Sequence, residues 1–499
     1  MKEKETIRKG NPTMKQNRKR MCMTLLLLTA GVLAACGGGE ETTAVTTDVE
    51  TTGTKTAAET EVLFDDGMPE RDMEGYTLTF LNYTDSALGW ALKDINRAEE
   101  TGDQVNDAIF ARNRRIEERY NAVITELYSD TVIDTFRNQV MAGATDFTLA
   151  QIYDVMANSL HIAGTLLTWD NLPMINLEAE WWNQDANASF QVNGAQFAAV
   201  GDFNLSEYSK SYLYFFNKDL YKSLGYDDDL YQLVRDGKWT KDKMLEIAKD
   251  AAKDLNGDGK MDLNDQYGLA ETAKIHFQLL ITGAGYKYID VDRDGNPYFT
   301  VSGNESLISY MQELVDDHTD TSWYYMSEKP NGACPNEAFQ PGNTLFISST
   351  MWDTEYYRDY DFDIGMLPAP KADEAQEKYY TITVGGLVTV LPKTLSDAEN
   401  VGILLESLAA DSRYTCLPVY KEVTLQSKYA RDEGSADMID IIFDTQTYDL
   451  GVTTWGDVRT QFSESIFQKL STDIVSKVTK MEKTITKEIQ KTIDALDEE

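Results

Sequence analysis

The chain has 499 residues, too many for a single hydrophobic core, and 42% of them are hydrophobic, so we expect two or three globular domains. Its formal net charge of −37 excludes a nucleic-acid-binding role, because such a surface repels the phosphate backbone. The same charge favours a neutral or cationic ligand over an anionic one.

The first 61 residues are typical of an export signal and a tether rather than of a folded domain. A basic segment leads into the apolar run "MTLLLLTAGVLAA", which has the length of a signal-peptide core and is too short to span a bilayer comfortably. The run ends in "LAAC", which resembles the lipobox of bacterial lipoproteins; this resemblance implies that residues 1–35 are removed and that Cys36 carries a diacylglyceryl anchor. Residues 36–61 are rich in Thr, Glu and Gly, so we expect a disordered tether at the extracellular face of the membrane.

Two points about this end of the chain and its cysteines stay open. Translation from Met14 would also give a normal signal, and an ordinary cleaved signal would leave Cys36 without a lipid. Loss of residues 1–35 would lower the net charge by six further units, because they hold eight basic and two acidic side chains. Cys334 and Cys416 could form a disulfide outside the cell, although nothing in the sequence fixes their distance.

From Tyr76 onward, strands and helices alternate. The segment "YTLTFLN" has the alternating pattern of a half-buried strand, the helix that follows places Val105, Ile109 and Ile116 on one face, and a turn at Asn121 leads into "AVITEL". This strand–helix–strand order predicts an α/β domain with a mainly parallel sheet. Later segments continue this alternation of strands and helices. They are a strand that leads into a short helix, "SYLYFFNKDLYKSLG", a helix that begins at Thr240, the strands "NTLFISS" and "ITVGGLVTVLP", and an amphipathic C-terminal helix over residues 474–496.

An acidic loop within this alternation has the spacing of a calcium-binding loop. Gly259 supplies the sharp turn between oxygen-bearing residues. The candidate ligands are Asp254, Asn256, Asp258, the carbonyl of Lys260, Asp262 and Asp265. The last of these is shorter than the usual Glu, which weakens selectivity for Ca²⁺ over Mg²⁺, and a metal-free turn is the alternative.

The loop does not have the surroundings of a calcium sensor. The segment "QYGLAETAK" after it is not a good exiting helix, and a second acidic run has Pro297 and Tyr298 where late ligands should lie, so a β-turn at Asp294–Gly295 is the better interpretation. We therefore predict a structural Ca²⁺ that rigidifies one lobe, and no organic cofactor.

The order of several segments resembles the family 1 extracellular solute-binding proteins, which are the carbohydrate-binding components of ABC importers. The resemblance covers residues 76–495 and rests on "RNRRIEERYN", "NGAQFAAVGDFNLSEYSKSYLYFFNKDLY", "GNTLFISSTMWDTEY", "DFDIGMLPAPK" and "ITVGGLVTVLPK". It implies a two-lobed, type II periplasmic-binding-protein-like α/β fold, with a hinge between the lobes and a ligand cleft at their interface. Lobe 1 would take residues 62–203 and 384–430, and lobe 2 would take 204–383 and 431–499. The chain would cross between them near "GDFNLS" and "TITVGG".

The same resemblance suggests which residues bind the ligand. Aromatic rings cover the C–H faces of a sugar, while polar side chains answer its hydroxyls. Trp352 lies where maltodextrin-binding proteins stack a tryptophan on a sugar ring, and Trp455 is the second aromatic candidate. Further candidates are Trp181 and Trp182 in a loop, Asn82, Tyr83, Tyr153 and Asp154 at strand ends, and Asp202 and Tyr208 beside the first crossing.

The resemblance implies a monomer that delivers a carbohydrate, in particular an oligosaccharide, to the permease subunits of an importer, without catalysis. A peptide or polyamine ligand stays open because of the acidity. A surface glycoside-active enzyme is a weaker alternative, since paired carboxylates arise by chance among 83 Asp and Glu residues. No HExxH or GxSxG motif and no complete phosphate loop is present, and no tandem repeats favour an adhesin.

Overall fold

The computed structural model describes residues 65–89, 94–226, 229–327, 335–357, 359–425 and 433–497, and residues 60–499 belong to one compact unit. The predicted signal, the tether, Cys36 and Cys334 lie outside the described residues. Cys416 is buried and forms no disulfide with a described residue, so its pairing with Cys334 stays a prediction. Among the described helices, none is both long and apolar enough to cross a lipid bilayer.

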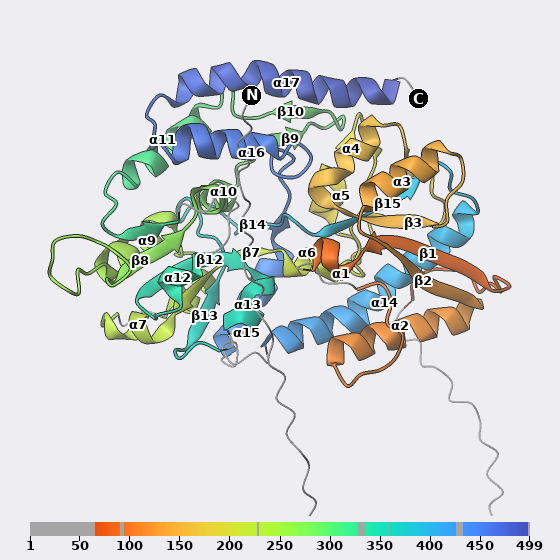
Figure 1. The fold of residues 1–499 in the computed structure, drawn as a ribbon, viewed down its shortest axis with the longest axis horizontal. Coiled ribbons are helices and arrows are strands. Elements are labelled where there is room, and N and C mark those ends of the chain that lie inside the picture. Colours follow the sequence, from red (N-terminus) through yellow and green to blue (C-terminus); the bar gives the residue numbers. More distant parts are fainter. Residues whose placement is uncertain are drawn as a thin grey trace, which may run out of the picture. The chain divides into compact units, whose positions relative to one another are not determined.

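The first of two large sheets has five strands in a mixed arrangement (Figure 1). Their order is β2 (Ala122–Ser129), β1 (Tyr76–Tyr83), β3 (Leu149–Tyr153), β15 (Leu387–Pro392) and β4 (Leu166–Leu167). Strand β1 runs parallel to β2 and β3, which confirms the predicted strand–helix–strand opening through α2 (Gln104–Tyr120). Strands β1, β2, β3 and β4 run in one direction, as expected of a mainly parallel sheet, and β15, which arrives from the second sheet, is the exception that runs antiparallel to both β3 and β4.

Helix α2 has the ends that its sequence predicts. The Asp103 side chain accepts a hydrogen bond from the Asn106 backbone N–H at the first turn, and Asn121 ends the helix in the left-handed conformation, with φ of 47°. Its buried face includes Val105, Ile109 and Ile116, as expected from their spacing.

The second large sheet is also five-stranded and mixed. Its order is β11 (Tyr324–Met326), β8 (Tyr267–Glu271), β12 (Thr344–Thr350), β7 (Tyr212–Asn217) and β13 (Ile364–Leu367). Strand β8 is parallel to β11 and β12, whereas β7 is antiparallel to β12 and β13. Two such sheets with their helices form the predicted two-lobed α/β architecture.

The helices and short strands that accompany the sheets follow in chain order. Before the second sheet they are α1 (Asp85–Leu88), α3 (Val132–Met141), η1 (Asp154–Met156), α4 (Ala157–Ile162), η2 (Trp169–Asn171), α5 (Gln184–Ser189), β5 (Gln191–Val192), β6 (Ala195–Gln196) and α6 (Leu205–Ser209). Within and after it they are α7 (Lys218–Ser223), α8 (Leu230–Arg235), α9 (Lys241–Ala251), α10 (Ala273–Gly283), β9 (Ile289–Val291), β10 (Pro297–Phe299), α11 (Glu305–Asp317), α12 (Asn336–Phe339), η3 (Met351–Asp353) and α13 (Thr354–Tyr357). Towards the C-terminus they are β14 (Thr381–Ile382), α14 (Ala398–Leu425), α15 (Glu433–Asp444), β16 (Gln446–Thr447), α16 (Asp457–Phe462), η4 (Ser463–Phe467) and α17 (Ile474–Asp497).

The chain passes between the two sheets in the regions that the sequence indicated. It leaves the first sheet through α6 into β7, and it returns from β13 through β14 into β15. A third segment, β16, pairs in parallel with β14 and so adds to the strands of this region.

Buried polar contacts fix the first crossing to the first sheet. The Asn204 side-chain amide donates to Gln151 Oε1 at 2.8 Å and to the Leu387 carbonyl at 3.0 Å, while its oxygen accepts from the Gly201 N–H at 3.1 Å. In the return crossing, Gly385 has φ of 96°, and a Cβ on Gly386 would lie 2.3 Å from Glu207 Oε1. Glycine is therefore favoured at position 385 by conformation, and a side chain at position 386 would have to displace the buried Glu207 carboxylate.

The C-terminal helix α17 confirms its predicted amphipathic pattern. Ile474, Val478, Ile485 and Ile489 are buried, and the helix contacts α11 and β10 as well as α4 (Figure 1). The side-chain amide of Asn158, in α4, donates to Thr492 Oγ1 at 3.4 Å. One helix therefore packs against α4, which follows β3 of the first large sheet, and against α11, which precedes β11 of the second.

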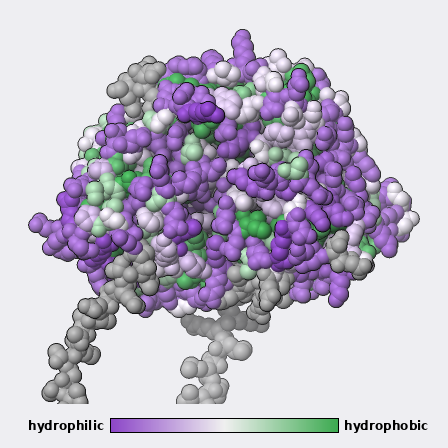
Figure 2. All heavy atoms as spheres, turned by 180° about the vertical axis from the view of Figure 1, so that it is seen from behind, coloured by the Kyte–Doolittle hydropathy of each residue, from purple (hydrophilic) through white to green (hydrophobic). Residues whose placement is uncertain are grey.

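The second acidic run forms the turn that the sequence predicts. Strands β9 and β10 are an antiparallel hairpin, Gly295 has φ of 78°, and the Asp292 carboxylate accepts from the N–H groups of Asp294 and Asn296. On the face shown in Figure 2 the surface is mainly hydrophilic, with small scattered hydrophobic areas, as expected from 26% charged residues.

Replacing Asn204 by Ala should lower the free energy of unfolding by about 1–3 kcal/mol, because Gln151 and the Leu387 carbonyl would lose a buried donor. Urea denaturation of the folded chain measures this change. The matched control is Asn171→Ala, which removes an exposed amide that bonds only to Thr168 Oγ1 and should cost less than about 0.5 kcal/mol. Equal losses for the two variants would contradict a fixing role for Asn204.

Candidate functional site

The candidate site is a cavity of about 790 Å³ to which several elements contribute, named here the Tyr153–Trp455 cavity. Its walls come from the end of β3 with η1 and α4, from the first turn of α10, from residues 452–461, and from one face of α17. The side chains used below are Tyr153, Asn158, Lys274, Thr454, Trp455, Asp457, Arg459 and Glu488. The volume is in the range of natural ligand pockets.

The loop that carries Trp455 is built around the buried carboxylate of Asp449. This carboxylate accepts from the backbone N–H groups of Tyr288 at 2.8 Å, Ile289 at 3.2 Å and Gly451 at 2.8 Å. Burial raises the pKa of Asp449 to about 6, and these hydrogen bonds oppose the rise. A hydrogen bond from the backbone N–H of Trp455 to the backbone carbonyl of Leu450, at 2.7 Å, closes the loop and holds Trp455 in place.

Tyr153 is positioned by groups at the end of β3. Its backbone N–H donates to the Tyr83 hydroxyl at 3.4 Å. The next residue, Asp154, is fully buried, and its carboxylate accepts from the N–H groups of Gly385 at 2.8 Å and Val155 at 2.6 Å. Burial raises the pKa of Asp154 to about 7 and that of Tyr83 to about 12.

Four residues that line the Tyr153–Trp455 cavity each have a polar side-chain atom that is buried behind the cavity wall and has no hydrogen-bond partner among the described residues. Asn158 Oδ1, Thr454 Oγ1, Trp455 Nε1 and Arg459 Nε are buried and have no hydrogen-bond partner within the part of the chain that the structure describes. Such atoms cost about 1–3 kcal/mol each and usually have a reason, such as a ligand or a water molecule. Oxygen acceptors and N–H donors around an aromatic ring suit a ligand with many hydroxyls and apolar C–H faces.

A second, smaller pocket of about 170 Å³ holds Trp352, together with Met351, Tyr420 and the start of α2. Trp352 follows β12, as its sequence position predicted, and Lys210 Nζ lies 5.2 Å from the centre of its ring. The charge of Lys210, like that of Arg459, lowers the pKa of Asp154 against the effect of burial. Trp352 and Trp455 line separate pockets. Each pocket lies near a cation that lowers the pKa of Asp154, which is Lys210 for Trp352 and Arg459 for Trp455.

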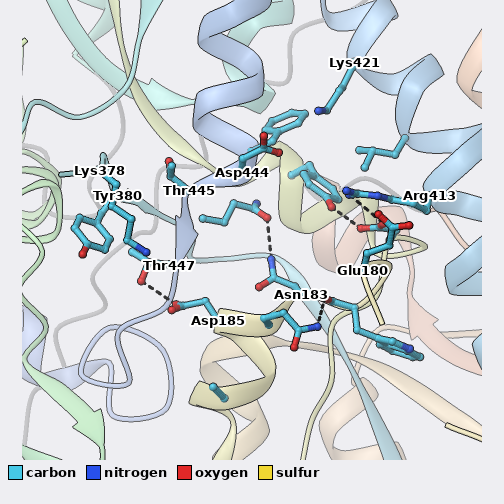
Figure 3. Close-up of a pocket in the computed structure, with 18 residues that line it drawn as sticks. Glu180, Asn183, Asp185, Lys378, Tyr380, Arg413, Lys421, Asp444, Thr445 and Thr447 are labelled. Carbon is cyan, nitrogen blue, oxygen red and sulfur yellow. Dashed lines mark hydrogen bonds and ion pairs between the residues drawn. The ribbon is translucent and has the colours of Figure 1, made fainter. Parts of the chain in front are cut away.

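A third cavity, of about 560 Å³, is the one in Figure 3, and Trp182, Asp202 and Tyr208 line it. Its polar groups are bonded to one another: the Tyr208 hydroxyl donates to Asp202 at 2.5 Å and Arg413 donates to the same carboxylate at 3.4 Å. Burial raises the pKa of Asp202 to about 7. None of the buried unpartnered atoms found among the described residues lines this cavity or the Trp352 pocket.

The paired tryptophans of the loop have packing partners. The indole N–H groups of Trp181 and Trp182 both donate to Glu406, at 2.8 and 3.0 Å, and Trp182 is only 2% exposed and packs edge-on against Trp169 and Phe203. Asn82 is likewise buried; it donates to Glu126 and accepts from the Tyr83 N–H. The side chains of Trp181, Trp182 and Asn82 do not line the Tyr153–Trp455 cavity.

Sequence reasoning missed several lining residues of the cavity, above all Lys274 and Arg459. Arg459 follows Trp455 by four residues, and Lys274 comes shortly after the end of β8, so helical spacing and strand-end position could have indicated both. Asn158 and Thr454 carried no such signal beyond their closeness to Tyr153 and Trp455.

The acidic loop lies between α9 and β8, away from the lining residues of the three cavities. Its side chains accept hydrogen bonds from the loop's own backbone: Asp254 from Gly257 and Gly259, Asn256 from Asp258, Asp258 from Lys260, and Asp262 from Asn264. Asp265 accepts from Leu255 and Asp262, and a backbone bridge from Lys253 to Gln266 closes the loop. Over the described ranges no three His, Cys, Asp or Glu side chains converge as metal ligands, so Ca²⁺ binding stays a prediction.

Comparison with known proteins identifies the fold. No family model and no curated protein matches the sequence. An ABC substrate-binding protein from Listeria monocytogenes, solved with cycloalternan, is 13% identical, with a TM-score of 0.52 over 83% of this chain and 99% of that chain. UgpB from Mycobacterium tuberculosis, solved with glycerophosphocholine, is 15% identical, with a TM-score of 0.52 over 84% and 98% of the two chains. An uncharacterized protein from Listeria monocytogenes EGD-e is 13% identical, with a TM-score of 0.53 over 84% and 99%.

The fold of this chain is thus the two-lobed periplasmic-binding-protein fold of ABC substrate-binding proteins, as the resemblance of its segments implied. At such identities the likeness extends to the fold alone and leaves the ligand open.

Replacing Asp154 by Asn should flatten the pH dependence of stability between about pH 4 and pH 7. In this window the unfolded carboxyl is ionised while the folded one still holds its proton, so stability falls as the pH rises towards 7. Urea denaturation at pH 5 and pH 7 should show that the variant loses about 1–2 kcal/mol of this difference. The control Asp361→Asn, at an exposed position, should keep the difference in free energy of unfolding between pH 5 and pH 7. If Asp154→Asn also kept this difference, the raised pKa of Asp154 would be contradicted.

Proposed function

We propose that the protein is an extracellular, lipid-anchored substrate-binding protein of an ABC importer that captures an oligosaccharide and delivers it to the membrane permease. The observation that carries this proposal is the lining of the Tyr153–Trp455 cavity, in which two aromatic residues, Tyr153 and Trp455, lie beside the polar residues Asn158 and Thr454. A carbohydrate supplies both hydroxyls for such polar side chains and a C–H face for an aromatic ring. The fold, and the sugar ligand cycloalternan of the similar Listeria protein, support the same class.

Capture in this proposal is a conformational event without bond chemistry. Ligand contacts with Tyr153 on the side of the first sheet and with Trp455 on the side of the second favour a closed arrangement of the two sheets. The crossing segments, with Gly385 in a conformation that only glycine adopts freely, are where the backbone would bend. The lipid on Cys36 would keep the protein near its permease.

Among alternative ligands, a polyamine is disfavoured by the cavity itself. Lys274 and Arg459 line it, and a polycation would be repelled by both. A peptide remains the competing ligand, because Asn158 and Thr454 could bond to amides as well as to hydroxyls. A thermal-shift screen against monosaccharides, oligosaccharides, peptides and polyamines separates these classes, and a saturable shift with peptides or polyamines only would overturn the proposal.

With an oligosaccharide that gives a shift, Trp455→Phe should weaken binding by about tenfold, measured by titration calorimetry, because the smaller ring covers less of the C–H face of the sugar. The matched control is Trp323→Phe, which removes an indole N–H that is also buried and unpartnered but does not line the cavity. Affinity in Trp323→Phe should be unchanged. Should Trp352→Ala abolish binding while Trp455→Phe leaves it intact, the ligand would occupy the Trp352 pocket instead.

We also propose that the loop of residues 254–265 holds a structural Ca²⁺. The carboxylates of Asp254, Asp258 and Asp262 each have acceptor capacity beyond the backbone bonds described, as hard cations require. Chelation with EGTA should lower the melting temperature by a few degrees and leave oligosaccharide affinity nearly unchanged, because the loop lines none of the three cavities. The control is Asp258→Asn, which should melt lower and respond less to EGTA. Loss of affinity without loss of stability would contradict a structural role.

A further inference from the structure

The Tyr153–Trp455 cavity contains two cationic side chains that come from different parts of the chain. Lys274 lies in the first turn of α10, directly after β8, and Arg459 lies in α16, one helical turn after Trp455. Both are half-buried. Neither side chain makes an ion pair or hydrogen bond with any residue that the structure describes, and Arg459 Nε is fully buried.

This lack of partners distinguishes them from other partly buried cations of the same chain. Lys241 lies 2.9 Å from the carboxylates of both Asp242 and Asp317, and Arg115 bonds to Asp411 through two nitrogens. In a chain with 83 acidic and 46 basic residues, carboxylates for pairing are abundant. Two adjacent cations left without them are therefore a specific feature of this cavity.

Electrostatics add to the argument. The pKa of the Lys274 ammonium is lowered, first by burial and then by the charge of Arg459, while Asp457 and Glu464 oppose this without pairing. Lys274 also lies at the N-terminal end of an eleven-residue helix, where the helix dipole is positive. An anion bound here would relieve the repulsion and gain charge-assisted hydrogen bonds.

The acidic groups that line the cavity do not cancel this preference. Asp457 and Glu488 are exposed, so water and salt screen their charges, whereas Lys274 and Arg459 are partly removed from solvent. The net charge of the whole chain, which favoured a neutral or cationic ligand, describes the surface and not this cavity.

We propose that the ligand is an acidic saccharide whose carboxylate or sulfate group is held by Lys274 and Arg459 while its sugar rings lie against Trp455. This inference rests on the proposed carbohydrate-binding function and narrows its substrate class. The polar residues Tyr153, Asn158 and Thr454 also line the cavity, so it has uncharged hydrogen-bonding side chains for the hydroxyls of the sugar. A carboxylate of a uronic acid and a sulfate ester present the same chemistry to the two cations.

The test is titration calorimetry with matched probes. One arm compares oligogalacturonides with the neutral galacto-oligosaccharides obtained by reducing their carboxyl groups; a second compares sulfated with unsulfated galacto-oligosaccharides. Tighter binding of the acidic member in the first arm identifies a uronic acid, and in the second arm a sulfate ester. Its affinity should exceed that of its neutral counterpart by about tenfold to 100-fold at low salt, and the excess should shrink at high salt.

Variants assign the effect to the two cations. Lys274→Gln and Arg459→Gln should each remove most of the preference for the acidic member, measured as the ratio of its affinity to the affinity of the neutral member in the same variant. The controls are Lys238→Gln at an exposed position and Arg137→Gln at a partly exposed one, and both should leave the preference intact. Melting temperatures of all four variants show whether each is folded.

The failures of the inference and of the proposed function are distinguishable. If neutral saccharides bind as tightly as acidic ones, or if the preference persists in Lys274→Gln and Arg459→Gln, the inference is overturned and carbohydrate binding stands. If no saccharide of either kind binds while peptides do, both are overturned.

Discussion

The hydrogen bond from the Gly385 backbone N–H to the buried Asp154 carboxylate holds the return crossing against the end of β3. Asp154 can make it because β3 ends one residue earlier, and Gly385 can make it because its left-handed backbone turns the chain there. The neighbouring Gly386 then approaches Glu207 of the first crossing, whose carboxylate a side chain would have to displace. Both crossings are thus packed around buried carboxylates, and Tyr153, next to Asp154, is placed in the cavity wall by this arrangement.

The three cavities differ in chemistry more than in size. In the cavity of Figure 3, opposite charges and amides bond to one another, as when Asn183 donates to Gln446 and Thr447 donates to Asp185. Such a network gains little from a ligand, because each new bond would replace an existing one. The residues that line the Tyr153–Trp455 cavity differ, because four of them keep a buried donor or acceptor without a partner among the described residues. In the proposed function, selectivity for a ligand follows from the chemistry of the cavity wall more than from its volume.

Much of the fold could be predicted from local patterns, because alternation, capping residues and turn residues act over a few positions. The ends of α2 and the hairpin at Gly295 are examples. The mixed arrangement of the sheets could not be predicted from such patterns, since the direction of β15 depends on the crossing that precedes it. Within the site, strand ends and family resemblance led to Tyr153 and Trp455. They could not indicate that the Trp182 indole donates to Glu406, because these two residues lie 224 positions apart in the sequence and no local pattern reveals the contact. Sequence reasoning missed Lys274 and Arg459 for a different reason, because whether a charge is paired depends on its neighbours in space and not on its neighbours in the sequence.

Helix α17 also has a consequence for when binding becomes possible. Thr484, Ile485 and Glu488 form part of the cavity wall, and Ile485 belongs at the same time to the core of the second lobe. Strand β15, near residue 390, is needed to finish the first sheet. A chain that emerges from the ribosome, or from a translocation channel, with its N-terminus first thus carries an unfinished binding wall until nearly all of it has passed. If the protein is exported as proposed, the order of synthesis alone keeps its cavity incomplete until late in translocation, without a dedicated inhibitor.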